Sequence, residues 1–375
     1  MKDKIIYLTY QTFPSDKANT IQTIDNAKYI KRKGYEITIV FPLRSEYSTD
    51  NKNILKKHYD FKEDIKFKGV KHNLPFGKYK RFEKYLFLFS HFIWTKRVVK
   101  SYLNDGNLNT IFFTRSDWIF YFLSRKDLNV TFECHQLTKL RKWIIKKSIK
   151  HERSKIIFLN KNLSRDSGLT NKYSDRFIVL HNGVDSELFN EKIINEKKIR
   201  EITFTGNIQR FNEDRGLRFI IDSFSNDNMP EEFNLKIIGW PVEQINELKE
   251  YINKVNLNHR VSIIEKLDRK STISEIQNSN IGLLVNSSTH THSFKHTSPL
   301  KYFEFLFGEL CIVAVDFPSH RSLPFSHNIS FFQENDQEGF IQALIETLDK
   351  KPLKRDQLES VTLNERVNTI LNFIQ

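Results

Sequence analysis

The first forty residues carry an order of segments that few folds accept: a short strand, a polar loop, a helix and a second strand. Residues 4–9 form an apolar run, and Ile24, Ala27 and Ile30 then recur at helical spacing. Gly34 follows three basic residues, which is typical of a helix C-terminus, and a β-branched run then ends at Pro42. This strand–helix–strand unit predicts the opening of a parallel sheet that is wound on both faces.

The same alternation continues through the rest of the chain in two series. Strand-like runs lie at 110–114, 129–132, 155–159 and 176–180, and then at 202–205, 235–238, 261–264, 281–285 and 311–315. Helices are expected at 244–254, 300–307, 338–348 and 363–374, whereas the polar segment 45–77 is not assigned to an element.

A chain of 375 residues is long enough for two hydrophobic cores. We therefore predict an α/β protein of two Rossmann-like, doubly wound parallel-sheet domains that face each other across a cleft. The expected boundaries are 1–190 for the first domain, 191–355 for the second, and 356–375 for a C-terminal helix that crosses back towards the first.

Charge is distributed unevenly between the two parts of the chain. Residues 1–180 hold 37 Lys and Arg against 17 Asp and Glu, whereas residues 181–375 hold 22 against 28. The first part therefore carries a formal charge of +20 and the second one of −6. A strongly basic face attracts phosphate groups, either of nucleic acid or of anionic lipid headgroups.

Composition is that of a folded protein, with 39% hydrophobic and 28% charged residues. The most apolar stretch, 85–94, is shorter than the roughly 18 residues that a membrane span needs, and the N-terminus lacks the pattern of a signal peptide. Cys134 and Cys311 fit a reducing compartment, and no metal-ligand spacing can be built from two cysteines. We expect a cytoplasmic protein that uses neither a metal nor another cofactor.

Six segments, in this order along the chain, carry a resemblance to one enzyme family. They are PSDKANTIQ at 14–22, FECH at 132–135, HNGVD at 181–185, FTGN at 204–207, TSPLKYFE at 297–304 and TLNER at 362–366. Together they resemble the retaining glycosyltransferases of the GT-B fold, specifically family 4 (group 1), and the resemblance covers about residues 4–373. It implies transfer of a hexose-type sugar from a nucleotide-diphosphate sugar to a saccharide acceptor.

In the first domain, the resemblance implies two site segments. Ala18, Asn19 and Thr20 lie where the family has a loop that reaches into the cleft, although many members carry a glycine pair there. His135 corresponds to a catalytic histidine at a strand end, which would contact a hydroxyl of the donor sugar; a histidine that merely caps a strand end is the alternative. The turn Asn182-Gly183 is expected to supply positive φ where the chain leaves this domain.

In the second domain, the segment after 204 resembles the phosphate loop of the family. Gly206 is present, but Asn207 stands where the family has arginine, and Arg215 before Gly216 fills the second basic place. Arg215 is the expected catalytic cation, because a departing diphosphate needs positive charge, and Arg210 lies between as a substitute. An ordinary exposed arginine is the alternative for both.

The segment 297–304 resembles the donor-binding loop and helix of the family. Ser298 is expected to cap a helix that Pro299, Leu300 and Lys301 begin, so that free N–H groups face the diphosphate. Glu304 would accept hydrogen bonds from both ribose hydroxyls. The family's first glutamate is replaced by His296, which could donate to a phosphate instead; no carboxylate accompanies the histidines nearby, so no metal is expected.

The basic half suggests where the acceptor lies. Lysines and arginines are mixed with aromatic residues at 78–100 and 139–150, a pattern that suits an anionic membrane surface. We expect a peripheral protein on the inner face of the cell membrane, with a lipid-linked saccharide as acceptor in the synthesis of a surface polysaccharide, such as lipopolysaccharide, or of a glycolipid. Solvated faces of core helices are the alternative.

Four other classes of function fit the sequence less well than this family does. A nucleotide-sugar epimerase would use the same scaffold without an acceptor, and a non-catalytic nucleotide-sugar binder would fit the departures at Asn207 and His296. A nucleic-acid partner is not expected, because no zinc finger, RNA-recognition signature or helix-turn-helix is present. A dinucleotide dehydrogenase is disfavoured, because no G-x-G-x-x-G follows the first strand.

Overall fold

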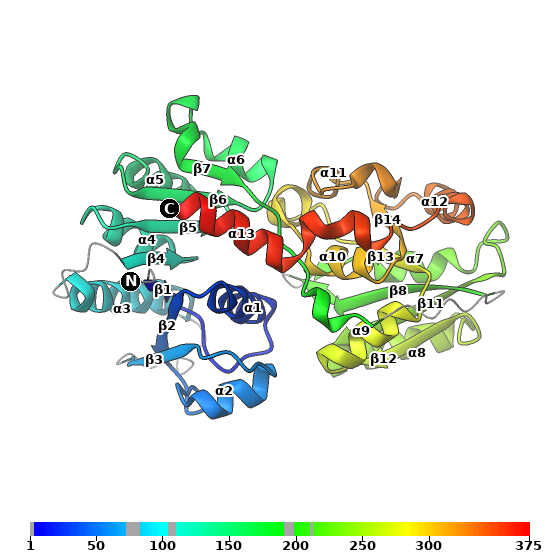
Figure 1. Cartoon of the computed structure of the whole chain (residues 1–375). Coiled ribbons are helices and arrows are strands. Elements are labelled where there is room, and N and C mark those ends of the chain that lie inside the picture. The colour runs from blue at the N-terminus through cyan, green and yellow to red at the C-terminus, as the bar shows by residue number, and fades with distance from the viewer. Residues whose placement is uncertain (1–3, 73–82, 104–109, 191–198, 211–212) are drawn as a thin grey trace. The chain divides into compact units, whose positions relative to one another are not determined.

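The structure is a computed structural model that describes residues 4–72, 83–103, 110–190, 199–210 and 213–375. The chain divides into two compact units, which are described separately (Figure 1). Unit 1 comprises Met1–Leu180 and Arg366–Gln375, and unit 2 comprises His181–Glu365. The domain boundaries predicted from the sequence lie after residues 190 and 355.

Unit 1 is built on a seven-stranded sheet in the order β3-β2-β1-β4-β5-β6-β7, with every neighbouring pair parallel. The strands are β1 (Lys4–Leu8), β2 (Glu36–Leu43), β3 (Lys66–Lys71), β4 (Thr110–Thr114), β5 (Val130–Cys134), β6 (Ser154–Phe158) and β7 (Phe177–Val179). The order of the strands reverses between β1 and β4, and the carboxyl ends of those strands define the switch point of this sheet.

The helices of unit 1 bury apolar side chains. The helices are α1 (Ala18–Arg32), α2 (Lys52–Tyr59), α3 (Glu83–Leu103), α4 (Asp117–Ser124), α5 (Lys139–Ser148) and α6 (Lys161–Ser167). The buried apolar side chains range from a single leucine in α2 to a cluster shared by α3, α4 and α5. Apolar residues of α3, α4 and α5, such as Trp94, Phe120 and Ile144, form one buried cluster with the sheet. Unit 1 is completed by the last helix of the chain, α13 (Leu363–Ile374), and by η2 (Asn171–Arg176).

Unit 2 has a six-stranded sheet in the order β12-β11-β8-β13-β14-β15, and its neighbouring pairs are also parallel. The strands are β8 (Arg200–Asn207), β11 (Phe233–Trp240), β12 (Val261–Glu265), β13 (Ile281–Leu284), β14 (Cys311–Val315) and β15 (Ile329–Phe332). A separate hairpin pairs β9 (Gln209–Arg210) with β10 (Glu213–Asp214). The switch point of the large sheet lies between β8 and β13.

Two clusters of buried side chains hold helices against the sheet of unit 2. The helices are α7 (Leu217–Ser223), α8 (Val242–Lys254), α9 (Arg269–Gln277), α10 (Leu300–Phe307), α11 (Pro318–Arg321) and α12 (Gln337–Asp349). Shorter turns are η3 (Ser186–Leu188), η4 (His292–His296), η5 (Ser326–Asn328) and η6 (Arg355–Val361). One cluster joins α7, α8 and α12 to the sheet, and the other contains α9 and α10.

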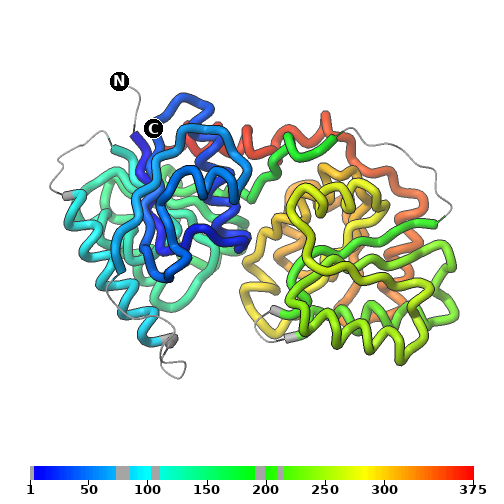
Figure 2. Tube along the Cα trace, turned by 90° about the horizontal axis from the view of Figure 1, so that it is seen from below, coloured from blue at the N-terminus to red at the C-terminus, as the bar shows by residue number. Residues whose placement is uncertain are grey.

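The helix α13 carries the chain from unit 2 into unit 1, since Leu363–Glu365 belong to the former and Arg366 onwards to the latter. Within unit 1, the amide of Gln375 donates to the Tyr35 hydroxyl at 2.6 Å and the Lys155 ammonium to the Phe373 carbonyl at 2.5 Å. The C-terminal end of the chain therefore lies against unit 1 (Figure 2).

The expected turn at Asn182-Gly183 is wrong in one respect, because Gly183 does not have positive φ. The chain instead passes close to Thr362: a Cβ on Gly183 would lie 3.0 Å from the Thr362 carbonyl oxygen. Val184 pairs with Thr362 in an isolated parallel bridge next to this contact. Close backbone approach within unit 2, and not a left-handed conformation, therefore requires the glycine.

Candidate functional site

The carboxyl end of β8 separates from β13 at the switch point of unit 2. The pairing of β8 with β11 continues to Asn207, whereas its pairing with β13 stops at Thr203. The carbonyl groups at the end of β8 are thus left without ladder partners on the β13 side. Ligands of doubly wound sheets bind at this place, where the strand order reverses.

Two positively charged side chains, those of Arg215 and Lys301, lie where β8 and β13 separate. The guanidinium of Arg215 donates to the Asn207 carbonyl at 3.1 Å and to the Val285 carbonyl at 3.2 Å, so it links the end of β8 to the segment after β13. The Lys301 ammonium donates to the Thr205 carbonyl at 3.1 Å and lies 3.9 Å from the centre of the Phe204 ring. Both positive charges are therefore held at the end of one strand.

A buried histidine interacts electrostatically with these two cations. His320 is 2% exposed, and its Nδ1 lies 2.8 Å from the Val315 carbonyl oxygen. Burial lowers the pKa of His320 to about 4, and the charges of Lys301 and Arg215 add to that effect against the opposing bond to Val315. His320 is therefore neutral at pH 7 and adds no further positive charge beside Lys301 and Arg215.

Two glycines shape the loop that carries Arg215. Gly206 has φ of 130° and Gly216 has φ of 84°, and both conformations are costly for residues with a Cβ. Asn207 is exposed, and its side chain accepts from the backbone N–H of Gln209 at 3.2 Å. The backbone of Arg210 lies in the small hairpin of β9 and β10, and its side chain lies outside the described part of the chain.

The segment before α10 differs from the expectation for its cap. Helix α10 begins at Leu300 with Pro299 as N-cap, so the prediction that Ser298 caps it is wrong. The Ser298 hydroxyl instead accepts from the Asn182 backbone N–H at 3.3 Å, and the Ser298 carbonyl accepts from the Asn182 amide at 2.5 Å. The two segments that resemble family motifs, 181–185 and 297–304, are thus joined by direct hydrogen bonds within unit 2.

The remaining residues of the expected donor site lie on this segment and on α10. His296 is 4% exposed and ends the π-helical turn η4. Glu304 is half-buried on α10, one turn after Lys301. Unit 2 therefore gathers Gly206, Asn207, Arg215 and Lys301 at the end of β8.

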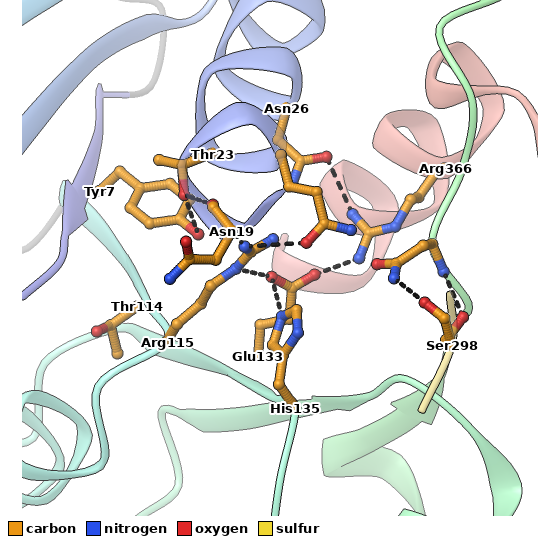
Figure 3. Close-up of polar contacts among 12 residues, drawn as sticks. Tyr7, Asn19, Thr23, Asn26, Thr114, Arg115, Glu133, His135, Ser298 and Arg366 are labelled. Carbon is orange, nitrogen blue, oxygen red and sulfur yellow. Dashed lines mark hydrogen bonds and ion pairs between the residues drawn. The ribbon is translucent and has the colours of Figure 1, made fainter. Parts of the chain in front are cut away.

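A buried carboxylate organises the carboxyl ends of β4 and β5 in unit 1 (Figure 3). Glu133 is fully buried, and its Oε2 accepts from Arg115 Nε at 2.5 Å and from His135 Nε2 at 3.1 Å. Its Oε1 accepts from Arg366 Nη2, which α13 supplies. Burial raises the pKa of Glu133, but the positive groups Arg115 and Arg366, with His135, hold it well below its usual range.

The expected cleft loop meets this network at the first turn of α1. The carbonyl of Asn19 accepts from Arg115 Nη1 at 3.0 Å, whereas the hydroxyl of Thr20 donates to backbone carbonyls of Ser15 and Lys17. Ala18 and Asn19 are exposed and Thr20 is buried. Unit 1 thus brings Asn19 and His135 together around one carboxylate.

Sequence reasoning did not assign a role to Arg115, Glu133 or Arg366. A signal was present for Glu133, because an acidic residue stands inside an otherwise apolar strand and needs a buried partner. The partners come from positions 18 residues upstream and 233 residues downstream, which no local pattern connects.

Within the described ranges, no helix is both long and apolar enough to cross a membrane. The same residues contain no group of three or more His, Cys, Asp or Glu side chains that could hold a metal ion.

No protein-family model matches the sequence, and no curated protein matches it. The structure, in contrast, is similar to solved structures along its whole length. Sucrose-phosphate synthase from Thermosynechococcus elongatus has a TM-score of 0.67 and 11% identity, with 100% of this chain and 96% of that chain covered. The lipopolysaccharide outer core galactosyltransferase WaaB has a TM-score of 0.65 and 12% identity, with 99% of each chain covered.

Anabaena Alr3699/HepE, solved in complex with UDP and glucose, has a TM-score of 0.60 and 12% identity, with 98% of this chain and 94% of that chain covered. At such identities the likeness concerns the fold. The prediction of two Rossmann-like parallel-sheet domains is confirmed, and the chain has the GT-B fold of these glycosyltransferase structures.

Proposed function

We propose that this protein is a retaining glycosyltransferase of family 4 that transfers a hexose-type sugar from a nucleotide-diphosphate sugar. The observation that carries the proposal is the pair of cations, Arg215 and Lys301, held at the switch point of unit 2. Fixed positive charge at that place suits a diphosphate, because it binds the donor and stabilises the charge that develops as the diphosphate leaves. Structures with the same fold contain UDP and glucose, which supports this class of donor.

The donor would be bound by the residues that the family resemblance assigns. Glu304 accepts hydrogen bonds from the ribose hydroxyls, and the backbone between Ser298 and Lys301 faces the diphosphate. Arg210 and His296 are candidate donors to phosphate oxygens, and His135 of unit 1 contacts a hydroxyl of the sugar. Two positively charged side chains lie at the end of β8, together with Gly206 in a positive-φ conformation and the exposed Asn207. These features agree with this assignment.

In this proposal the reaction keeps the anomeric configuration of the donor. The leaving diphosphate takes the proton of the acceptor hydroxyl on the face that it departs from, so no general base from the protein is needed. The protein contributes position and electrostatic support. No metal or other cofactor takes part in the proposed reaction.

The acceptor would be a lipid-linked saccharide that is reached from an anionic membrane on its cytoplasmic side. Apolar side chains stand exposed on α3, among them Tyr85 at 72%, Phe89 at 58% and Ile93 at 41%. Trp143 of α5 is 44% exposed, and its ring lies tilted against the Tyr121 ring of α4, with the centroids 5.4 Å apart. Helix α4 packs on both α3 and α5. Exposed basic residues accompany them at Lys96, Arg97, Lys100, Lys139, Lys146 and Lys147.

Exposed aromatic side chains that are interleaved with lysine suit a bilayer interface with anionic headgroups. The basic cluster at 78–81, which belongs to the same sequence pattern, lies outside the described residues. In this proposal unit 1 faces the acceptor and the membrane, and unit 2 binds the nucleotide sugar.

The test is sugar transfer from labelled UDP-glucose, UDP-galactose, UDP-N-acetylglucosamine or GDP-mannose to a bacterial lipid extract. We expect label in the lipid fraction with one donor, and sensitivity of the product to an α-specific glycosidase, because all four donors are α-linked. Arg215→Met should lower the transfer rate about a hundredfold or more. Arg218→Met removes an exposed arginine at the second residue of α7 and should leave the rate within about twofold.

Equal transfer by the Arg215→Met and Arg218→Met proteins would contradict the assignment of Arg215. A product that only a β-specific glycosidase cleaves would contradict retention. Release of free sugar without any labelled lipid would contradict a lipid-linked acceptor.

A further inference from the structure

Three side chains hold the Glu133 carboxylate, and two of them are positively charged, although one positive charge would neutralise it. Two guanidinium groups and an imidazole surround it, and all three donate to its two oxygens (Figure 3). Arg115 is tied further to the Asn19 carbonyl and to Gln22, and Arg366 donates through Nη1 to Asn26 at 3.1 Å. Both guanidinium groups therefore have fixed orientations, and they fix the carboxylate in turn.

The arrangement determines which nitrogen of His135 carries the proton. An ionised carboxylate only accepts hydrogen bonds, so Nε2 of His135 must be the donor in the 3.1 Å contact with Glu133. Burial and the charge of Arg115 lower the pKa of His135 to about 4, while Glu133 opposes them, so the ring is neutral at pH 7. A neutral imidazole with its proton on Nε2 presents Nδ1 as an acceptor.

We propose that Glu133 and Arg366 are positioning residues, which hold His135 in one orientation and one tautomer so that Nδ1 accepts a hydrogen bond from a sugar hydroxyl. The sugar contact rests on the function proposed above. The claim about orientation and tautomer rests on this network alone, in which Glu133 is fully buried and Arg366 is 3% exposed.

Arg366 differs from Arg115 because it reaches the network from the last helix of the chain. Arg115 follows β4 and lies beside Glu133 through the pairing of β4 with β5, whereas Arg366 reaches it only when α13 is docked on unit 1. Lys155 also fastens α13 to unit 1, through the Phe373 carbonyl and ring, but it does not touch Glu133. Lys155 therefore offers a matched control for a purely structural role of Arg366.

The experiment records histidine side-chain ¹⁵N–¹H correlation spectra of the whole protein at pH 7, with the His135 signals assigned from a His135→Gln variant. We expect the wild-type His135 to show a protonated Nε2 and an unprotonated Nδ1. Glu133→Gln should give a mixture of tautomers, and Arg366→Met should shift or broaden the His135 signals. Lys155→Met should leave them at the wild-type positions, although it also loosens α13.

Kinetics of sugar transfer provide the second measurement. Arg366→Met should lower kcat about tenfold or more with a change of less than about threefold in the KM for the donor, because the ring is displaced while most donor contacts remain. Arg366→Lys should restore part of the loss by returning a charge to Glu133. Lys155→Met should keep the wild-type kcat.

The outcomes separate this inference from the proposed function. Wild-type His135 signals in Arg366→Met, or losses of kcat that Lys155→Met shares, would overturn the positioning role. If the wild-type protein transfers no sugar, the proposed function and the sugar contact fail together. The spectra would then still decide whether Glu133 and Arg366 set the tautomer of His135.

Discussion

In unit 2, the side chains of Arg215 and Lys301 hold the end of β8 in place and also supply the positive charge there. Arg215 and Lys301 donate to carbonyls that lack partners in the sheet, so their side chains have little freedom to move. Each is also placed over the ring of Phe204, at 5.3 Å for Arg215 and 3.9 Å for Lys301. Position and charge are therefore determined by the same contacts.

Lys301→Met should weaken binding of a nucleoside diphosphate about tenfold or more, because a charge-assisted bond to phosphate is worth roughly 1.5–3 kcal/mol. The corresponding nucleoside, which lacks phosphate, should bind the variant and the wild type alike. Isothermal titration calorimetry measures both ligands. Equal losses for nucleoside and diphosphate would mean that Lys301 supports the fold of the site and not its charge.

The stability of the protein should fall on mild acidification, because buried histidines are neutral in the folded state. Burial is the largest cause that lowers the pKa of His91 and of His320 to about 4. The unfolded chain has a histidine pKa near 6.5, so it binds more protons between these values and the folded state loses stability as the pH falls. From pH 7.5 to 5.5 each histidine should cost about 1 kcal/mol of unfolding free energy.

Urea unfolding at the two pH values measures this loss. His91 lies 2.7 Å from the Ser116 hydroxyl and stacks on Tyr10. His91→Gln should therefore reduce the pH dependence of the unfolding free energy. The exposed His259→Gln is the control and should leave it unchanged. Stability that is the same at both pH values would show that these rings take up protons without unfolding.

Strand β13 and helix α10 illustrate how closely elements pack beside the switch point. Gly282 of β13 lies under Phe305 of α10, and a Cβ there would come within 2.3 Å of the Phe305 ring and 2.8 Å of its Cβ. The glycine thus sets how near the donor helix comes to the sheet. A shift of α10 would also move Lys301, which lies on the same helix.

Gly282→Ala should destabilise unit 2 by about 1–3 kcal/mol, the usual cost of overpacking a core. Gly216→Ala has open space around it and pays only for its φ of 84°, so a loss of about 1 kcal/mol is expected. Urea unfolding compares the two variants. If Gly282→Ala costs no more than Gly216→Ala, the α10–β13 contact is softer than this packing implies.

Hydrophobic periodicity predicted most of the elements because most strands of the two sheets contain a short stretch rich in apolar residues, such as IGLL in β13 and CIVAV in β14. The helix expected at 363–374 is α13, and the strand expected at 311–315 is β14. In contrast, α2 and β3 were not assigned, because β3 lies at the edge of its sheet and its sequence KFKGVK is half lysine. The edge strand β15 was missed as well; it has only four residues.

The site residues were predictable where they belong to one sequence segment. They were not predictable where contacts between distant segments determine their positions. The segment FTGN led to Gly206 and Asn207 at the end of β8, where Gly206 has positive φ. The cap at Ser298 could not be foreseen, because Asn182, 116 residues away, takes its hydroxyl. The pairing of Glu133 with Arg366 depends on where α13 docks, which the sequence of α13 does not state.

For the molecule as a whole, the uneven distribution of charge agrees with the two proposed roles, membrane contact for unit 1 and donor binding for unit 2. Residues 1–180 carry +20 and residues 181–375 carry −6, and the exposed apolar side chains of α3 and α5 belong to the basic part. An anionic bilayer would thus attract unit 1 and not unit 2.

We predict binding to vesicles that contain anionic phosphatidylglycerol and little binding to vesicles of phosphatidylcholine alone. A Phe89→Ser and Trp143→Ser double variant should bind several-fold more weakly, because two apolar side chains are lost from the interface. Trp240→Ser removes a side chain of similar exposure from unit 2 and is the control. Sedimentation with vesicles measures all three; equal binding to both kinds of vesicle would argue against a charged membrane contact.

The central claim is that unit 2 binds a nucleoside diphosphate, and a thermal-shift titration with UDP, GDP, ADP and CDP tests it most directly. One nucleotide should raise the melting temperature in a concentration-dependent way, because a ligand of the folded state stabilises it by mass action. Glu304→Ala should reduce the affinity about tenfold or more, whereas the exposed Glu247→Ala should not. If no nucleotide shifts the wild-type protein, or if Glu304→Ala binds as the wild type does, the donor site is not the one described.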